Sequence, residues 1–161
     1  MMPPVPHNST SLVLRRKFQA TRQRVFNAWI EPLALETWLR PRGMAMIVRS
    51  LDARMGGSFS FELESGQCIV GTYLHIVSPE KLVFTWSGEA IQDRETIVTL
   101  DFLDQGPVTE VVLTHEGLVT SDLYALFEHG WSPLLDALAL LLSSLSTADM
   151  LSTEACTARH G

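Results

Sequence analysis

The side chain best suited to chemistry in this sequence is His115, near the end of a strand-like run late in the chain. Its imidazole could act as a general acid or base, because its unperturbed pKa lies near neutrality. Strand alternation puts His115 on one face with Val111 and Leu113, and Glu116 on the other face with Thr114. A catalytic histidine needs a second group to orient it, and no local residue supplies one. The pattern therefore favours a hydrogen-bonded core histidine, or one that faces a ligand without reacting.

Other reactive patterns do not point to a catalytic centre. Tyr73 is a further polar candidate, because a few placed polar groups usually orient a ligand in an apolar pocket. His75 and His129 stand apart, and no His, Cys or acidic residues share a tight metal-ligand spacing. There is no Gly-x-Ser-x-Gly elbow and no Gly-rich phosphate loop. The sequence predicts no metal and no cofactor.

Apolar residues with suitable alternation could form the wall of a binding chamber. For each of them, ordinary core packing is the alternative interpretation. Together with Tyr73 and His115, the candidate ligand-binding residues are Trp29, Trp38, Phe59, Phe61, Phe84, Trp86, Val98, Leu100, Leu113, Trp131, Leu134 and Leu138. In this interpretation, Trp29 and Trp38 close one end of the chamber.

The last members of this set belong to a long amphipathic helix predicted over residues 122–145. Apolar residues recur there at alternating intervals of three and four, at Tyr124, Phe127, Trp131, Leu134, Leu138, Leu141 and Leu145. Short alternating segments separated by turns precede this helix and predict an antiparallel sheet. The fold class is therefore α+β, with a sheet packed against one C-terminal helix.

The predicted sheet has about seven strands, with two short helices inserted after the first. Thr21 can cap the first of these helices, and Pro32 suits the first turn of the second. The strands are expected at residues 12–18, 44–51, 59–63, 68–77, 82–86, 95–103 and 109–116. Such a sheet is roughly 30 Å wide, whereas a helix with its side chains is ~10–12 Å across. We therefore expect the sheet to curl around the helix and enclose an apolar chamber.

Length and composition limit the remaining classes. The 161 residues fit one domain, which we place at 11–146 between a loosely held lead-in (1–10) and a flexible tail (147–161). A formal charge of −6 argues against nucleic acid as a partner. The longest apolar run is far below the ~20 residues that span a bilayer, so no membrane insertion is expected. Cys68 and Cys156 indicate no disulfide framework, and a cytoplasmic location is predicted.

Several short motifs, taken in series over about residues 12–145, resemble the activator of Hsp90 ATPase homologue 1-like family. The first group comprises VFNAW at 25–29, Pro32, WLRP at 38–41, Asp52, Arg54, GGSF at 56–59, Gly71 and Tyr73. The second comprises SPEKLVFTW at 78–86, THEG at 114–117, HGW at 129–131, Leu135 and Leu138. Pro133 departs from the helix-friendly residue expected in the family.

This resemblance implies a START-like helix-grip fold, in which a curved antiparallel sheet grips a long C-terminal helix around a deep apolar cavity. The larger superfamily includes lipid and hormone binders, polyketide cyclases and proteins that sequester small aromatic molecules. The family's name comes from a domain of a eukaryotic co-chaperone, so the name alone does not assign an activity.

Three functions follow as hypotheses. The first is noncatalytic binding of a small hydrophobic or aromatic molecule inside the cavity. The second is an enzyme of cyclase or hydrolase type that uses His115 with Tyr73 or an acidic neighbour, which requires a buried polar pair. The third is a co-chaperone-like interaction module, which requires an exposed patch where Val83, Thr85, Val112 and Thr114 would point outward. Outward Val and Ile residues would also suit a homodimer.

Overall fold

The computed structural model describes residues 11–91 and 93–160, apart from the side chains of Ala90 and of residues 144–160. The lead-in predicted at residues 1–10 lies outside the described residues. The strands are β1 (Ser11–Phe18), β2 (Met46–Leu51), β3 (Ser58–Leu63), β4 (Cys68–Val77), β5 (Lys81–Gly88), β6 (Thr96–Gln105) and β7 (Val108–Glu116). The helices are α2 (Arg22–Asn27), α3 (Pro32–Trp38), η1 (Pro41–Gly43), η2 (Glu89–Ile91) and α4 (Ser121–His160).

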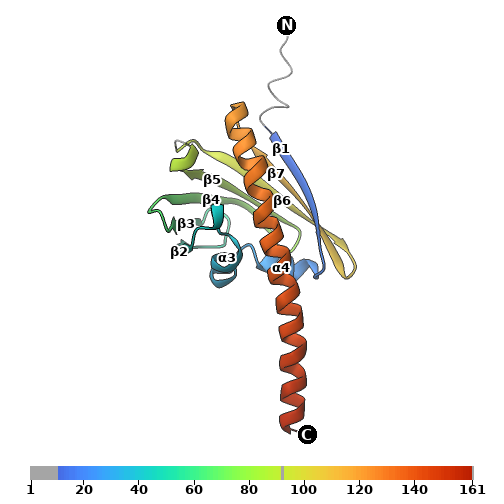
Figure 1. Cartoon of the computed structure of the whole chain (residues 1–161). Coiled ribbons are helices and arrows are strands. Elements are labelled where there is room, and N and C mark those ends of the chain that lie inside the picture. Colours follow the sequence, from blue (N-terminus) through green and yellow to red (C-terminus); the bar gives the residue numbers. More distant parts are fainter. Residues whose placement is uncertain (1–10, 92, 161) are drawn as a thin grey trace.

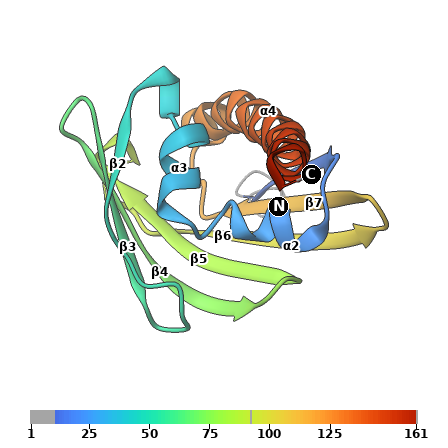
Figure 2. The ribbon, with the colours of Figure 1, turned by 90° about the horizontal axis from the view of Figure 1, so that it is seen from below.

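The seven strands form one antiparallel sheet with the order β1-β7-β6-β5-β4-β3-β2. This confirms the predicted fold class, with α2 and α3 inserted after the first strand as expected. The pairing shifts register between Val48 and Ser50 on β2 and between Tyr73 and His75 on β4. Such irregularities bend a strand and increase its twist. The sheet curls accordingly and partly surrounds α4, as Figures 1 and 2 show.

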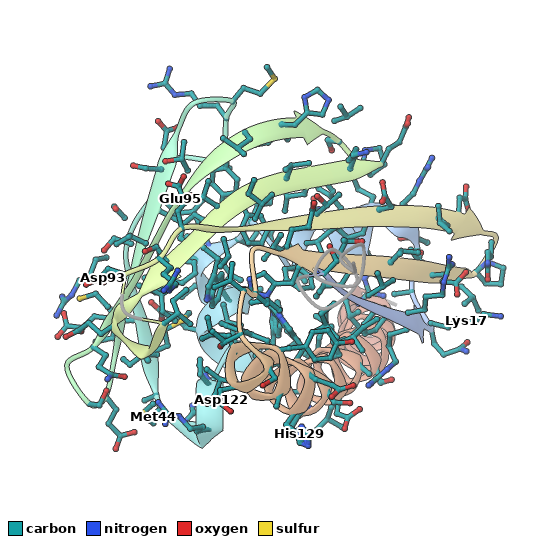
Figure 3. The ribbon with its side chains drawn as sticks, turned by 90° about the horizontal axis from the view of Figure 1, so that it is seen from above. Lys17, Met44, Asp93, Glu95, Asp122 and His129 are labelled. Carbon is teal, nitrogen blue, oxygen red and sulfur yellow. The ribbon has the colours of Figure 1, made fainter. Side chains whose placement is uncertain are left out.

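The concave face of the sheet is covered by more than one helix. α4 packs along β1, and α3 lies between α4 and β2 at the opposite edge (Figure 2). The sheet is wider than one helix, as expected from the sequence, and α3 covers part of the width that α4 leaves open. α3 buries Leu35 and Trp38 there. Side chains occupy much of the space between sheet and helix, while Lys17 and His129 point outward (Figure 3).

Strand alternation selects the buried residues of the sheet as predicted. Val111, Leu113 and His115 on β7 are buried, whereas Glu116 is exposed. The buried residues of β7 pair in register with Phe102, Leu100 and Val98 on β6. These rows face the helices and form one continuous hydrophobic core.

Gly71 on β4 allows an aromatic side chain to lie directly on the sheet. A Cβ atom at this position would come within 2.3 Å of the Phe59 ring and 2.1 Å of the Thr85 carbonyl oxygen. Only glycine permits this close approach. The Phe59 ring also stacks on Phe61 at 4.7 Å and meets Phe84 edge-on at 5.7 Å. Aromatic rings therefore fill this part of the concave face.

Polar contacts fix α4 to strand β1 and to helix α2. Arg16 on β1 forms an ion pair with Asp136 on α4, and the Arg24 guanidinium donates to the Leu142 carbonyl over 3.4 Å. The helix continues to His160, beyond the predicted end at residue 145. No proline or glycine interrupts residues 146–160, which explains why the helical backbone can continue. Among the described residues, no helix combines the length and apolar character needed to cross a membrane.

Candidate functional site

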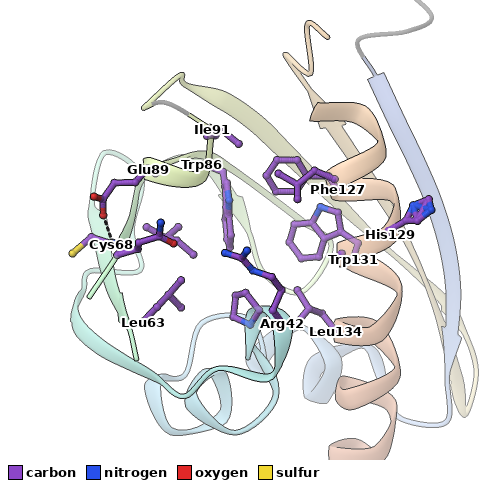
Figure 4. Close-up of a pocket in the computed structure, with 16 residues that line it drawn as sticks. Arg42, Leu63, Cys68, Trp86, Glu89, Ile91, Phe127, His129, Trp131 and Leu134 are labelled. Atoms are coloured by element: carbon purple, nitrogen blue, oxygen red, sulfur yellow. Dashed lines mark hydrogen bonds between the residues drawn. The ribbon is translucent and has the colours of Figure 1, made fainter. Parts of the chain in front are cut away.

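A pocket of about 470 Å³ opens between α4 on one side and η1, the start of β4 and the end of β5 on the other (Figure 4). We call it the α4 pocket. Its lining residues are Pro41, Arg42, Leu63, Gln67, Cys68, Ile69, Trp86, Gly88, Glu89, Ile91, Leu126, Phe127, His129, Gly130, Trp131 and Leu134. Most of these side chains are apolar, and the polar ones come from η1, η2, the β3–β4 turn, the start of β4 and, at His129, from α4.

Two tryptophans form the inner wall of the α4 pocket. Trp86 comes from β5 and Trp131 from α4, and their ring centroids lie 5.6 Å apart. Leu134 follows Trp131 by one helical turn, so both reach the same side of α4. Leu63 and Ile69 line the side made by β3 and β4. The geometry suits a flat apolar molecule that contacts aromatic faces.

The two charged side chains of the pocket wall, Glu89 and Arg42, differ in whether they have a polar partner. The Glu89 carboxylate accepts a hydrogen bond from the Cys68 backbone N–H over 3.2 Å and lies at the side of the opening. Arg42 extends from η1 into the pocket (Figure 4), and no ion pair joins it to any described carboxylate. The His129 ring points away from the pocket, and its Nδ1 lies 3.2 Å from the Ala125 carbonyl.

Helix α4 contributes backbone as well as side chains to the wall. Gly130 lines the pocket, and a Cβ atom added there would meet nothing within 4 Å. Pro133 lies inside α4 and has no N–H to donate to the carbonyl of His129, four residues earlier. The carbonyl of His129 therefore lacks its usual intrahelical partner at the level of the pocket.

His115 lies behind the pocket wall in a buried chain of hydrogen bonds. The Trp131 indole Nε1 lies 3.1 Å from His115 Nδ1, and His115 Nε2 lies 2.8 Å from Thr96 Oγ1. The Thr96 hydroxyl donates to the carbonyl of Trp86 over 2.7 Å. The chain therefore connects both tryptophans of the pocket wall through one imidazole.

The direction of these hydrogen bonds determines the protonation state of His115. An indole N–H can only donate, so His115 Nδ1 must accept and carries no proton. Nε2 then carries the proton and donates to Thr96, whose own proton goes to the Trp86 carbonyl. Burial also lowers the pKa of His115 to about 3. The imidazole is thus neutral, and both of its nitrogens are occupied.

This arrangement argues against His115 as a general acid or base. A proton could reach Nδ1 only if the hydrogen bond from Trp131 broke. The polar partner of His115 is Thr96, and within the described residues no hydrogen bond joins His115 to Tyr73. Burial raises the pKa of the Tyr73 phenol, so that group also stays protonated. His115 is a positioning residue that holds the pocket wall.

Within the part of the chain described, no three His, Cys, Asp or Glu side chains are grouped as metal ligands would be.

The structure brings three of the predicted ligand-binding residues to the α4 pocket: Trp86, Trp131 and Leu134. The other predicted residues are buried in the core around it, at Trp29, Trp38, Phe59, Phe61, Tyr73, Phe84, Val98, Leu100, Leu113, His115 and Leu138. Trp38 donates its indole N–H to the Ala28 carbonyl over 2.9 Å, and its ring meets Trp29 edge-on.

The sequence interpretation missed the loop-borne residues of the pocket. Arg42, Gln67, Glu89 and Ile91 lie in η1, η2 or a hairpin, where strand or helix periodicity gives no signal. The only local signal at Arg42 is its position between Pro41 and Gly43, which marks a turn.

The exposed patch predicted on the outer face of the sheet is only partly present. Thr85 is buried, and its hydroxyl oxygen accepts a hydrogen bond from the Thr72 backbone N–H over 2.8 Å. Val83, Val112 and Thr114 are half-buried. Thr85 therefore contributes to the sheet rather than to an exposed interaction patch.

Comparisons with known proteins agree with this architecture. A protein of Chromobacterium violaceum is 29% identical, with a TM-score of 0.72, and the match covers 83% of this chain and 96% of that one. A protein of Rhodobacter sphaeroides is 23% identical, with a TM-score of 0.75 over 87% and 96% of the two chains. An HSP90 activator from Plasmodium falciparum is 22% identical, with a TM-score of 0.67 over 83% and 96%. No curated protein matches the chain.

The family comparison covers almost all of the domain described above. The family model described as activator of Hsp90 ATPase homolog 1-like protein matches residues 19–143, from the end of β1 to the part of α4 that packs on the sheet. The chain therefore belongs to the activator of Hsp90 ATPase homologue 1-like family.

Proposed function

We propose that the protein binds a small hydrophobic or aromatic molecule in the α4 pocket without transforming it chemically. The observation that carries this proposal is the pocket itself, whose volume of about 470 Å³ is enclosed mainly by apolar side chains. Ligand pockets typically measure about 300–1,000 Å³ and have such walls, with a few polar groups. Trp86 and Trp131 offer faces on which a planar molecule can stack.

The state of His115 supports binding over catalysis. The imidazole donates to Thr96 and accepts from Trp131, so neither nitrogen is free to exchange a proton with a bound molecule. The same hydrogen bonds hold the Trp131 ring in the wall. A pocket whose wall is fixed before binding loses less conformational entropy when the ligand enters.

Native mass spectrometry tests this proposal. Protein purified gently from its own cells should carry a noncovalent molecule of a few hundred daltons. A Gly130→Phe variant, whose new ring would occupy the pocket, should be recovered without it. The same molecule on both proteins would mean that it binds elsewhere and would contradict the proposal.

A second candidate function is contact with an Hsp90-type chaperone, supported by the family description and by the Plasmodium falciparum neighbour. Size-exclusion chromatography of the protein mixed with purified Hsp90, together with the ATPase rate of Hsp90, tests this function. It is separable from ligand binding, because Gly130→Phe would block the pocket and leave the outer face of the sheet unchanged. Light scattering of the protein alone tests the homodimer predicted from the sequence.

A further inference from the structure

We infer that the molecule held in the α4 pocket is an apolar or aromatic carboxylate whose anionic group is bound by Arg42. This inference rests on the proposed binding function and specifies the class of ligand. Its starting point is the unequal pairing of the arginines. Arg15, Arg16 and Arg49 each lie within 4.0 Å of a carboxylate, and so does Arg54. The described arginines without such a partner are Arg22, Arg24, Arg40, Arg42 and Arg94, and of these Arg42 is the one that lines the pocket.

The backbone at Arg42 supports a directed role. Arg42 adopts φ 54° and ψ 28°, a left-handed conformation that residues with a Cβ atom rarely adopt. The next residue, Gly43, is also left-handed at φ 77°, and its N–H bonds to the Arg40 carbonyl at 2.8 Å. This turn directs the exposed Arg42 side chain over the opening of the pocket (Figure 4). Unfavourable backbone conformations of this kind concentrate at ligand-binding sites.

The charges around Arg42 favour a single negative charge on the ligand. Arg42 is the one cationic side chain that points into the pocket among the described lining residues, because the His129 ring points away. Glu89 is the anionic one, and its carboxylate already accepts from the Cys68 N–H. A dianion such as a phosphate monoester would bring a second charge, for which the described lining residues offer no further cationic side chain. A carboxylate brings one charge and matches the planar fork of a guanidinium.

The apolar walls determine the rest of the ligand. Trp86 and Trp131 are the buried aromatic residues that line the pocket, and Leu63, Ile69 and Leu134 add further apolar surface. A molecule with its carboxylate at Arg42 would therefore place its apolar part against the two indole rings. We expect a ring or short chain that carries one carboxylate at its end.

The test compares naphthaleneacetate with its neutral amide, naphthaleneacetamide, at neutral pH. Dissociation constants come from quenching of tryptophan fluorescence and from calorimetry. The wild type should bind the acid about tenfold more tightly than the amide, as one partly exposed charge-assisted hydrogen-bonded pair would give. The Arg42→Gln variant should lose this preference and keep the affinity for the amide.

Two variants serve as controls. Arg42→Lys keeps the charge and should retain most of the preference for the acid. Arg40→Gln removes an exposed arginine that does not line the pocket, and it should behave as wild type. High salt should weaken binding of the acid and leave the amide unaffected.

Each other outcome has a definite meaning. Equal binding of acid and amide to the wild type would overturn the carboxylate inference and leave the proposed function standing. A preference for the acid that persists in Arg42→Gln would overturn the role of Arg42. Failure of the wild type to bind either probe would contradict the proposed function, and the inference with it.

Discussion

The indole N–H of Trp131 donates to Nδ1 of His115 over 3.1 Å, and this hydrogen bond joins the α4 side of the pocket wall to strand β7 of the sheet. It fixes the tautomer of the histidine and the orientation of the tryptophan together. Trp29 provides a contrast, because its buried indole N–H has no hydrogen-bond partner among the described residues.

The two tryptophans should therefore respond differently to the same substitution. Trp131→Phe leaves Nδ1 of the buried His115 without a donor, which costs about 1–3 kcal/mol in addition to the lost volume. Trp29→Phe removes a donor that has no partner, so only the volume is lost. Urea unfolding should show that Trp131→Phe is the less stable variant by about 1–2 kcal/mol. Equal losses would mean that the bond to His115 contributes nothing.

His115 should make stability depend on pH in mildly acidic solution. Its pKa is about 3 when folded and near the ordinary value of 6.5 when unfolded, so the unfolded chain binds the proton more tightly. The stabilisation is complete above pH ~6.5 and is lost as the pH falls towards the folded pKa, by at most about 1.4 kcal/mol per pH unit.

The matched variant for this prediction is His115→Gln. Glutamine can accept from Trp131 and donate to Thr96 without titrating in this range. The free energy of unfolding, measured by urea titration at several pH values, should fall less steeply for the variant than for wild type as the pH decreases. Parallel profiles would show that another group causes the acid sensitivity.

Arg42 should show opposite effects on stability and binding. Arg42→Gly relieves the left-handed conformation of a residue with a Cβ atom, which should stabilise the protein by about 1 kcal/mol. The same variant should lose the preference for a carboxylate ligand. Thermal unfolding and the paired titrations measure both effects. A destabilised Arg42→Gly protein would show that the Arg42 side chain stabilises the fold.

Gly130 should separate helix stability from pocket occupancy. Gly130→Ala adds a methyl group in open space and improves helix propensity, so it should stabilise the protein by about 0.5–1 kcal/mol and still bind ligand. The Gly130→Phe variant should also fold, but its ring should exclude naphthaleneacetate from the pocket. Calorimetric titration of both variants is the measurement, and unchanged binding to Gly130→Phe would place the ligand elsewhere.

The strands and their buried faces were predictable from local pattern. Phe59 and Phe61, or Leu113 and His115, alternate with polar residues, and this period follows from the geometry of any strand with one buried face. Helix α4 was predictable from the three- and four-residue spacing of its apolar residues, which follows from helix geometry. Its end was not predictable, because residues 146–160 contain no proline or glycine that would mark it.

The position of the pocket was not predictable in this way. Periodicity shows that Phe59 or Trp38 is buried, but it does not distinguish a residue packed against α3 from one that faces a space. That distinction depends on α3 filling the side of the sheet near β2, while η1 leaves Arg42 facing α4. Both are relationships between segments far apart in the chain.

A small apolar molecule held against Trp86 and Trp131 in the α4 pocket is what the proposed function requires above all. Nuclear Overhauser effects from naphthaleneacetate to the ring C–H protons of the four tryptophans test this most directly, because each tryptophan reports on a different place. We expect contacts to the rings of Trp86 and Trp131, which line the pocket, and none to the ring of Trp38, which is fully buried in the core away from it. Contacts to Trp38 in place of these two, or to none of the tryptophans, would contradict it.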